Sequence, residues 1–198
     1  MSSESMIAFF LFAVVAAATP GPSNVMVMSA GARAGLVGGL PCLAGVVAGM
    51  ALLMGVAGLG LGRVLQAWPA ALTALKWGGS LLLLWLAWQV ASAPPLAEAR
   101  GGAPIGFWRA LAFQWINPKS WIVGVSAAGT FGAAGDSSAL ERALALAAVF
   151  ALAAAPSCAI WLAFGAALQR WLHDARRARF FNVAMGIALA ASVVLVVR

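Results

Sequence analysis

The chain has 198 residues, of which 64% are hydrophobic and only 9% are charged, and its formal net charge is +7. Soluble domains carry roughly 25% charged residues, so water cannot be the main solvent of this chain. The positive charge does not indicate nucleic acid as a partner, because the Lys and Arg residues are scattered between apolar runs and form no single basic surface. We therefore expect an integral membrane protein whose main partner is the lipid bilayer.

The first apolar run covers residues 6–28. It could be read as a secretory signal, because Ala16, Ala17 and Ala18 resemble a cleavage site. A signal sequence begins with positive residues, however, and this segment begins with Glu4. We interpret the run as a retained transmembrane span.

Six apolar runs follow one another along the chain, each long enough for the ~20 residues that a bilayer crossing needs. They cover residues 6–28, 40–61, 70–90, 108–130, 143–168 and 180–197. Residues 92–106 are rich in Pro and Gly and form a linker between two three-span halves, 1–91 and 107–198. The sequence thus predicts an all-α membrane protein, with residues 1–198 forming a single transmembrane transporter domain.

Two prolines around a glycine interrupt the first span. Pro removes a backbone donor and clashes with the preceding helical turn, and Gly lowers helix propensity, so local unwinding is expected. A simple kink would need only one Pro. Unwound backbone inside a membrane is costly unless protein or a water-filled cavity covers it, which makes this segment a candidate binding site. Its candidate residues are Pro20, Gly21, Pro22, Ser23 and Asn24.

A second break is predicted in the fourth span at Asn117, Pro118 and Lys119, and Pro118 lies 98 positions after Pro20. Each half has an odd number of spans, so the second half enters the membrane with the opposite orientation. The result is an inverted 3+3 repeat with broken first and fourth spans. In transporters of this kind the substrate site lies where two discontinuous helices meet.

Lys119 would place a charge at the centre of a span, at a cost of about 2.5 to 3.5 kcal/mol on insertion scales. The acidic residues all lie outside the predicted span centres; they are Glu4, Glu98, Asp136, Glu141 and Asp174. A substrate carboxylate is one candidate partner for Lys119. Backbone carbonyls freed by the proline breaks and loss of the ammonium proton are the alternatives. Without a counter-charge for a cationic side chain, small neutral amino acids are favoured over lysine or arginine.

The Lys and Arg residues fall on alternate sides of the predicted spans. One side carries Arg33, Arg100, Arg109, Arg170, Arg176, Arg177 and Arg179, and the other carries Arg63, Lys76, Arg142 and Arg198. The positive-inside rule places the richer side in the cytoplasm. We therefore expect a multi-pass protein of the cell inner membrane with both termini outside the cytoplasm. The loop 170–179 would contact anionic lipids, and His173 within it is given no role.

Two further features are interpreted as packing. Cys42 and Cys158 lie in or beside apolar spans, without the spacing of a metal site or redox pair, and are expected to be small buried hydrophobes. Gly45 and Gly49 form a GxxxG pair that lets helices approach closely. We expect no metal site.

The two breaks together resemble the LysE/RhtB family of amino-acid exporters, which carries T-P-G-P in the first span and N-P-K in the fourth. Both motifs are present, as Thr19-Pro20-Gly21-Pro22 and Asn117-Pro118-Lys119. The resemblance implies efflux of amino acids or similar small metabolites driven by protons, with no enzymatic activity and no cofactor. The family usually places Asn directly after the first motif, whereas here Ser23 precedes Asn24. Either residue could make the equivalent contact.

Two alternatives belong to other classes of protein. A membrane thiol-disulfide electron carrier of the CcdA type would explain cysteines beside prolines, but its cysteines belong in the broken spans. A structural or assembly subunit would not explain Lys119. Self-association into a homo-oligomer is left open by the sequence.

Overall fold

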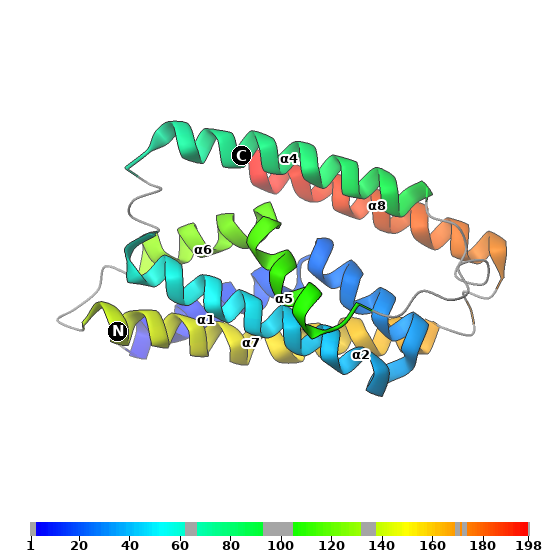
Figure 1. The fold of residues 1–198 in the computed structure, drawn as a ribbon, viewed down its shortest axis with the longest axis horizontal. Coiled ribbons are helices and arrows are strands. Elements are labelled where there is room, and N and C mark those ends of the chain that lie inside the picture. Colours follow the sequence, from blue (N-terminus) through cyan, green and yellow to red (C-terminus); the bar gives the residue numbers. More distant parts are fainter. Residues whose placement is uncertain are drawn as a thin grey trace.

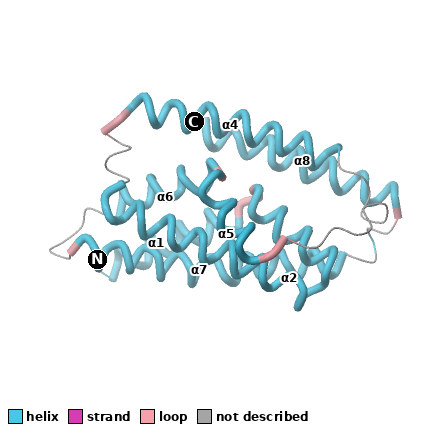
Figure 2. The backbone as a smooth tube through the Cα atoms, viewed as in Figure 1, coloured by secondary structure: helices cyan, strands magenta, loops and turns pink. Residues whose placement is uncertain are grey.

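The structure is a computed structural model that describes residues 3–61, 67–92, 105–131, 138–168, 171 and 174–197. These residues form seven α-helices and one π-helical segment (Figure 1). Figure 2 shows that the described part of the chain consists of helices and loops. The elements are α1 (Ser3–Ala18), α2 (Pro22–Val56), η1 (Ala57–Leu61), α4 (Pro69–Ser92), α5 (Phe107–Ile116), α6 (Pro118–Phe131), α7 (Ala139–Leu168) and α8 (Ala175–Val197). The expected all-α architecture is confirmed.

Both predicted breaks are present. In the first predicted span, helix α1 ends at Ala18 and helix α2 begins at Pro22. The fourth predicted span is divided at Asn117 into α5 and α6. Helix α2 also contains a break at Gly35, whose φ of 70° and ψ of −173° lie outside the helical region. Only glycine adopts such a positive φ readily. In Figure 1 the chain reverses direction within α2. The break at Gly35 therefore forms a turn where the sequence predicts a loop between the first two spans.

The remaining predicted spans agree with helices to within a few residues: 70–90 with α4, 143–168 with α7 and 180–197 with α8. Some predicted features lie outside the described residues, namely linker residues 93–104, the loop residues Arg170 and His173, and Arg63, Glu98, Arg100, Asp136 and Arg198.

Helix α2 packs most extensively against α7, and α4 against α8, with further contacts of α2 with α5 and of α1 with α7. Figure 1 shows α4 and α8 side by side along one edge of the molecule. The predicted GxxxG pair lies at the crossing of α2 and α5. A Cβ atom at Gly45 would collide with the carbonyl oxygen of Phe107, and one at Gly49 would lie 2.8 Å from that of Leu111. Helix packing as the role of this pair is therefore confirmed.

The interior is apolar and so is much of the exterior. One buried cluster includes Phe9, Met54 and Phe150, from α1, α2 and α7. Large side chains such as Val37 and Trp108 are nonetheless exposed, as suits a surface in contact with lipid. In the described part of the chain, two helical stretches are long and apolar enough to cross a membrane, Pro22–Gly60 and Ala139–Leu168.

Candidate functional site

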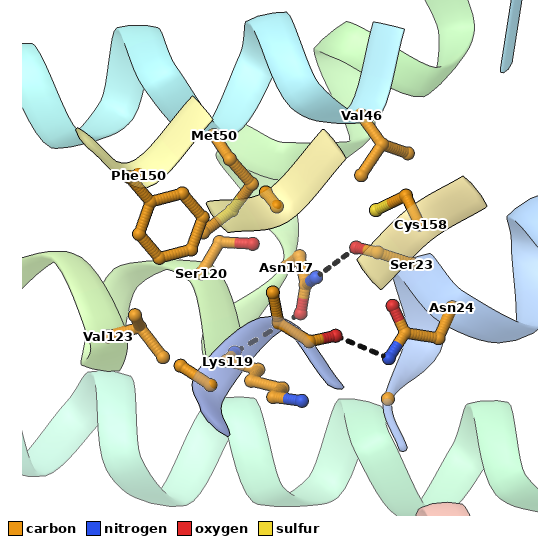
Figure 3. Close-up of a pocket in the computed structure, with 14 residues that line it drawn as sticks. Ser23, Asn24, Val46, Met50, Asn117, Lys119, Ser120, Val123, Phe150 and Cys158 are labelled. Atoms are coloured by element: carbon orange, nitrogen blue, oxygen red, sulfur yellow. Dashed lines mark hydrogen bonds between the residues drawn. The ribbon is translucent and has the colours of Figure 1, made fainter. Parts of the chain in front are cut away.

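The two helix breaks meet at a small cavity of about 40 Å³ (Figure 3). Such a volume holds a few water molecules. Five polar side chains line it: Ser23, Asn24, Asn117, Lys119 and Ser120. The apolar wall includes Val46 and Met50 from α2 and Phe150 from α7. Among the described lining residues, Lys119 carries the one full charge and there is no carboxylate.

Asn24 shapes the first break. Its side-chain Nδ2 donates hydrogen bonds to the carbonyl oxygens of Ala17 and Thr19, each at 2.9 Å. The Thr19 hydroxyl donates back to the carbonyl oxygen of Val15 at 2.6 Å, which closes the last turn of α1. The bonds from Asn24 give donors to carbonyl groups near the end of α1, where the helix leaves carbonyls without helical partners. Asn24 therefore holds its own break, and its bonds stay within the first span.

Asn117 shapes the second break by capping α6. Its Oδ1 accepts a hydrogen bond from the backbone N–H of Lys119 at 3.1 Å, as an N-cap side chain does. Pro118 is the first residue of α6, where the missing N–H costs nothing. Pro22 has the same place at the start of α2. Pro22 and Pro118 are therefore the structurally equivalent prolines. The spacing of 98 positions in the sequence instead matches Pro118 with Pro20.

Lys119 joins the second break to the first. Its Nζ donates to the carbonyl oxygen of Thr19 at 2.6 Å and reaches that of Pro20 at 3.5 Å. Of the two partners considered from the sequence, the freed backbone carbonyls contact Lys119 in the structure. The side chain passes closely over Gly21, where a Cβ atom would lie 2.9 Å from Lys119 Cδ and 3.0 Å from Nζ.

Ser23 makes the second connection between the breaks. Its hydroxyl accepts a hydrogen bond from Asn117 Nδ2 at 3.0 Å and donates one to Gln114 Oε1 at 2.9 Å. The sequence left open whether Ser23 or Asn24 makes the contact equivalent to that of the family's Asn. In the structure Ser23 spans the two breaks, and Asn24 binds only carbonyls of its own break.

Two polar residues of this cluster, Gln114 and Ser120, are absent from the sequence prediction. Gln114 is fully buried in α5, and its Oε1 also accepts the hydroxyl of Ser120 at 3.0 Å. A glutamine within the apolar run before Asn117 was the available signal. Its partner Ser23 lies 91 positions away, so its importance could not be read from local sequence.

The predicted site residues converge in space. Gly21, Ser23, Asn24, Asn117 and Lys119 line the cavity, while Pro20 lends its carbonyl oxygen to Lys119. Pro22 and Pro118 begin the two helices and do not line the cavity.

The two cysteines are buried free thiols, as expected. They share a buried cluster with Val46, and the thiol-bearing Cys158 of α7 also lines the cavity (Figure 3). That position was not anticipated from the sequence.

Residues 14–197 match the family model described as LysE type translocator. The chain belongs to the LysE type translocator family. This LysE chain is therefore a membrane translocator and not an enzyme, and the resemblance drawn from the two motifs is confirmed. No solved structure matches it.

Curated relatives of this LysE chain are named cysteine/O-acetylserine efflux proteins. That of Escherichia coli (strain K12) is 33% identical over 132 residues, which cover 66% of this chain and 67% of the relative. That of Shigella flexneri serotype 5b is 34% identical over 125 residues, 63% of this chain and 64% of the relative. The names assign efflux of cysteine and O-acetylserine to those relatives.

Proposed function

We propose that this protein exports small neutral amino acids or closely related metabolites through the cavity between its two helix breaks, driven by a proton gradient. The observation that carries the proposal is Lys119, a cationic side chain held at the meeting point of both breaks. An ionisable residue inside a membrane protein usually marks a substrate or ion pathway.

The proposed architecture is six transmembrane spans in an inverted 3+3 repeat within one domain. Its first span would be α1 with the start of α2, equivalent to α5 with α6; the rest of α2 would correspond to α7, and α4 to α8. The packing supports this correspondence, because the contact of α1 with α7 has its counterpart in that of α5 with α2. Likewise the contact of α4 with α6 has a counterpart in Ala32 of α2 packed against Ala178 of α8.

Both termini are proposed to lie outside the cytoplasm of a cell whose inner membrane holds the protein. In Figure 1 the N and C labels lie toward the left, while α4 ends and α8 begins toward the right. Arg176, Arg177 and Arg179 lie in the first turns of α8, at that right-hand end. The positive-inside rule favours the cytoplasm for this end.

The substrate carboxylate is proposed to bind Lys119 and the start of α2. No side chain caps that start, and Pro22 has no N–H, so the backbone amides of Ser23 and Asn24 are the first donors of the helix. A helix N-terminus carries partial positive charge suited to an anion. A bound carboxylate would replace the carbonyl oxygens of Thr19 and Pro20 as the acceptor for Lys119.

The cavity wall supports a neutral substrate side chain. Val46, Met50 and Phe150 offer an apolar surface, and the described lining residues provide no carboxylate for a cationic group. Cysteine and O-acetylserine, which the relatives are named for exporting, are both small and uncharged in their side chains. At about 40 Å³ the cavity is smaller than an amino acid, so we take the structure as a closed state that opens by movement around the breaks.

The test is efflux from proteoliposomes that contain the purified protein and one labelled amino acid at a time. An imposed proton gradient should accelerate efflux of cysteine, O-acetylserine or another small neutral amino acid, and leave lysine inside. Liposomes with Lys119→Ala protein at equal density are the control. Robust efflux of lysine but of no neutral amino acid would contradict the proposed substrate class.

A further inference from the structure

Gln114 lies behind the cavity and accepts hydrogen bonds from both broken spans. Its Oε1 receives the hydroxyl of Ser23 at 2.9 Å from the first break and that of Ser120 at 3.0 Å from α6. A carboxamide oxygen has two lone pairs, so both are used. Its Nε2 donates to the carbonyl oxygen of Ala110 at 3.1 Å, which fixes the orientation of the amide. The side chain is fully buried and is not among the cavity-lining residues.

The hydrogen bonds form a chain with one direction. The N–H of Lys119 donates to Asn117, Asn117 donates to the Ser23 hydroxyl, and Ser23 donates to Gln114. A hydroxyl has a single proton, and the Ser23 proton is used in the hydrogen bond to Gln114. The remaining capacity of Ser23 is as an acceptor, which receives Asn117 Nδ2. Gln114 thereby sets the orientation of two cavity-lining side chains without touching the cavity itself.

We propose that Gln114 is a positioning residue for transport: its carboxamide oxygen holds Ser23 and Asn117 in register and keeps the cavity closed in the absence of substrate. This inference rests on the proposed function for its role in transport, and its closing effect can be tested without a substrate. Opening the breaks must separate Ser23 from Gln114. Both groups are then exposed in a low-dielectric interior unless water or substrate replaces the lost bond.

Cys158 provides a reporter of cavity opening. It lines the cavity, and its side chain is only 2% exposed in the closed structure. In a Cys42→Ala background it is the single thiol of the chain, so alkylation by N-ethylmaleimide reports access to the cavity. The protein is reconstituted in lipid nanodiscs without amino acid, and the rate of alkylation is followed by mass.

Loss of the bond across the breaks should speed alkylation. We expect Ser23→Ala and Gln114→Leu each to raise the rate about fivefold, the factor that corresponds to a typical net hydrogen bond. The double variant should be no faster than the faster single variant, because both changes remove the same bond. Gln114→Glu keeps an oxygen that can accept the Ser23 hydroxyl and should therefore raise the rate less than Gln114→Leu does.

Two controls separate this effect from general loosening. Ser92→Ala removes a serine hydroxyl whose bond, to the Trp88 carbonyl oxygen at 2.6 Å, stays within α4 and away from the cavity, so the alkylation rate should be unchanged. Gln89→Leu makes the same substitution as Gln114→Leu at an exposed position of α4 and should also have no effect. Where Gln114→Leu does not fold, Ser23→Ala still decides the question.

The proposal is overturned if Ser23→Ala leaves the alkylation rate unchanged, if Ser92→Ala raises it equally, or if the double variant shows the product of the two single effects. Efflux assays on the same proteins keep the two proposals apart. Failure of the unaltered protein to export any amino acid would contradict the proposed function, but the alkylation results would still support the role of Gln114 in closing the cavity. Normal export together with an unchanged alkylation rate in Ser23→Ala would contradict only the proposed role of Gln114.

Discussion

Lys119 and Thr19 are 100 positions apart in the sequence, yet Lys119 Nζ donates to the Thr19 carbonyl oxygen at 2.6 Å. The bond gives a buried ammonium group an acceptor, and it gives a carbonyl at the end of α1 a donor. Without the other, each would be a buried polar group with no hydrogen-bond partner, which is costly inside a membrane protein.

Lys119→Ala should reduce export by at least about 100-fold, as expected when a charged hydrogen bond of roughly 3 kcal/mol is lost. The protein should still insert and accumulate, because removal of a buried charge leaves an apolar helix. The measurement is efflux per molecule of protein in proteoliposomes. Unaltered efflux would mean that the charge is only structural.

Lys119→Arg distinguishes recognition from coupling. A guanidinium keeps the positive charge but does not give up its proton. If Lys119 moves the coupled proton, this variant should bind amino acid, measured by thermal shift, without gradient-driven export. Loss of binding in both Lys119 variants would instead assign the residue to carboxylate recognition.

Gly21→Ala should displace Lys119, because the added Cβ would lie 2.9 Å from its Cδ and 3.0 Å from its Nζ. The long side chain can move, so folding should be preserved while the bond to Thr19 is weakened. We expect export to fall about tenfold, because a displaced Lys119 would also lose its bond to the substrate carboxylate, and the weaker end of the range for charged hydrogen bonds corresponds to about that factor. The matched control is Gly78→Ala on α4, where a Cβ meets nothing within 4 Å. Equal effects of the two substitutions would contradict this reasoning.

Replacement of both cysteines by Ala should leave export intact, since both are free thiols and the proposed mechanism uses neither. Efflux of a neutral amino acid by the cysteine-free protein measures this directly. Loss of transport, together with a disulfide detected between Cys42 and Cys158 in the unaltered protein, would support the electron-carrier alternative instead.

The orientation can be tested with single cysteines in that cysteine-free background. Arg176→Cys at the start of α8 should be cytoplasmic and Ala139→Cys at the start of α7 external; both positions are exposed. An impermeant thiol reagent added to intact cells with a permeable outer membrane should label position 139 only. Labelling of position 176 alone would reverse the assignment from Lys and Arg counting.

Proline chemistry made the two breaks predictable, because its missing donor acts on the neighbouring turn whatever the rest of the chain does. The predicted repeat placed Lys119 near the first break, but its carbonyl partners could not be predicted, because a substrate carboxylate was an equally reasonable acceptor and the amine could also have lost its proton. Gln114 was overlooked because its bond to Ser23 depends on tertiary packing. The reversal at Gly35 was hidden for another reason: a glycine among apolar residues looks the same whether it packs helices or turns the chain.

The tight crossing of α2 over α5 at Gly45 and Gly49 bears on how the protein is made. Helix α2 emerges from the ribosome well before α5, so its glycine-lined face and the polar groups of Ser23 and Asn24 first meet lipid or the insertion machinery. Their permanent neighbours on α5, α6 and α7 arrive only with the second half of the chain. Helices α1, α2 and α4 thus have no finished core of their own during synthesis, and we expect a chain truncated after α4 to be removed by membrane quality control.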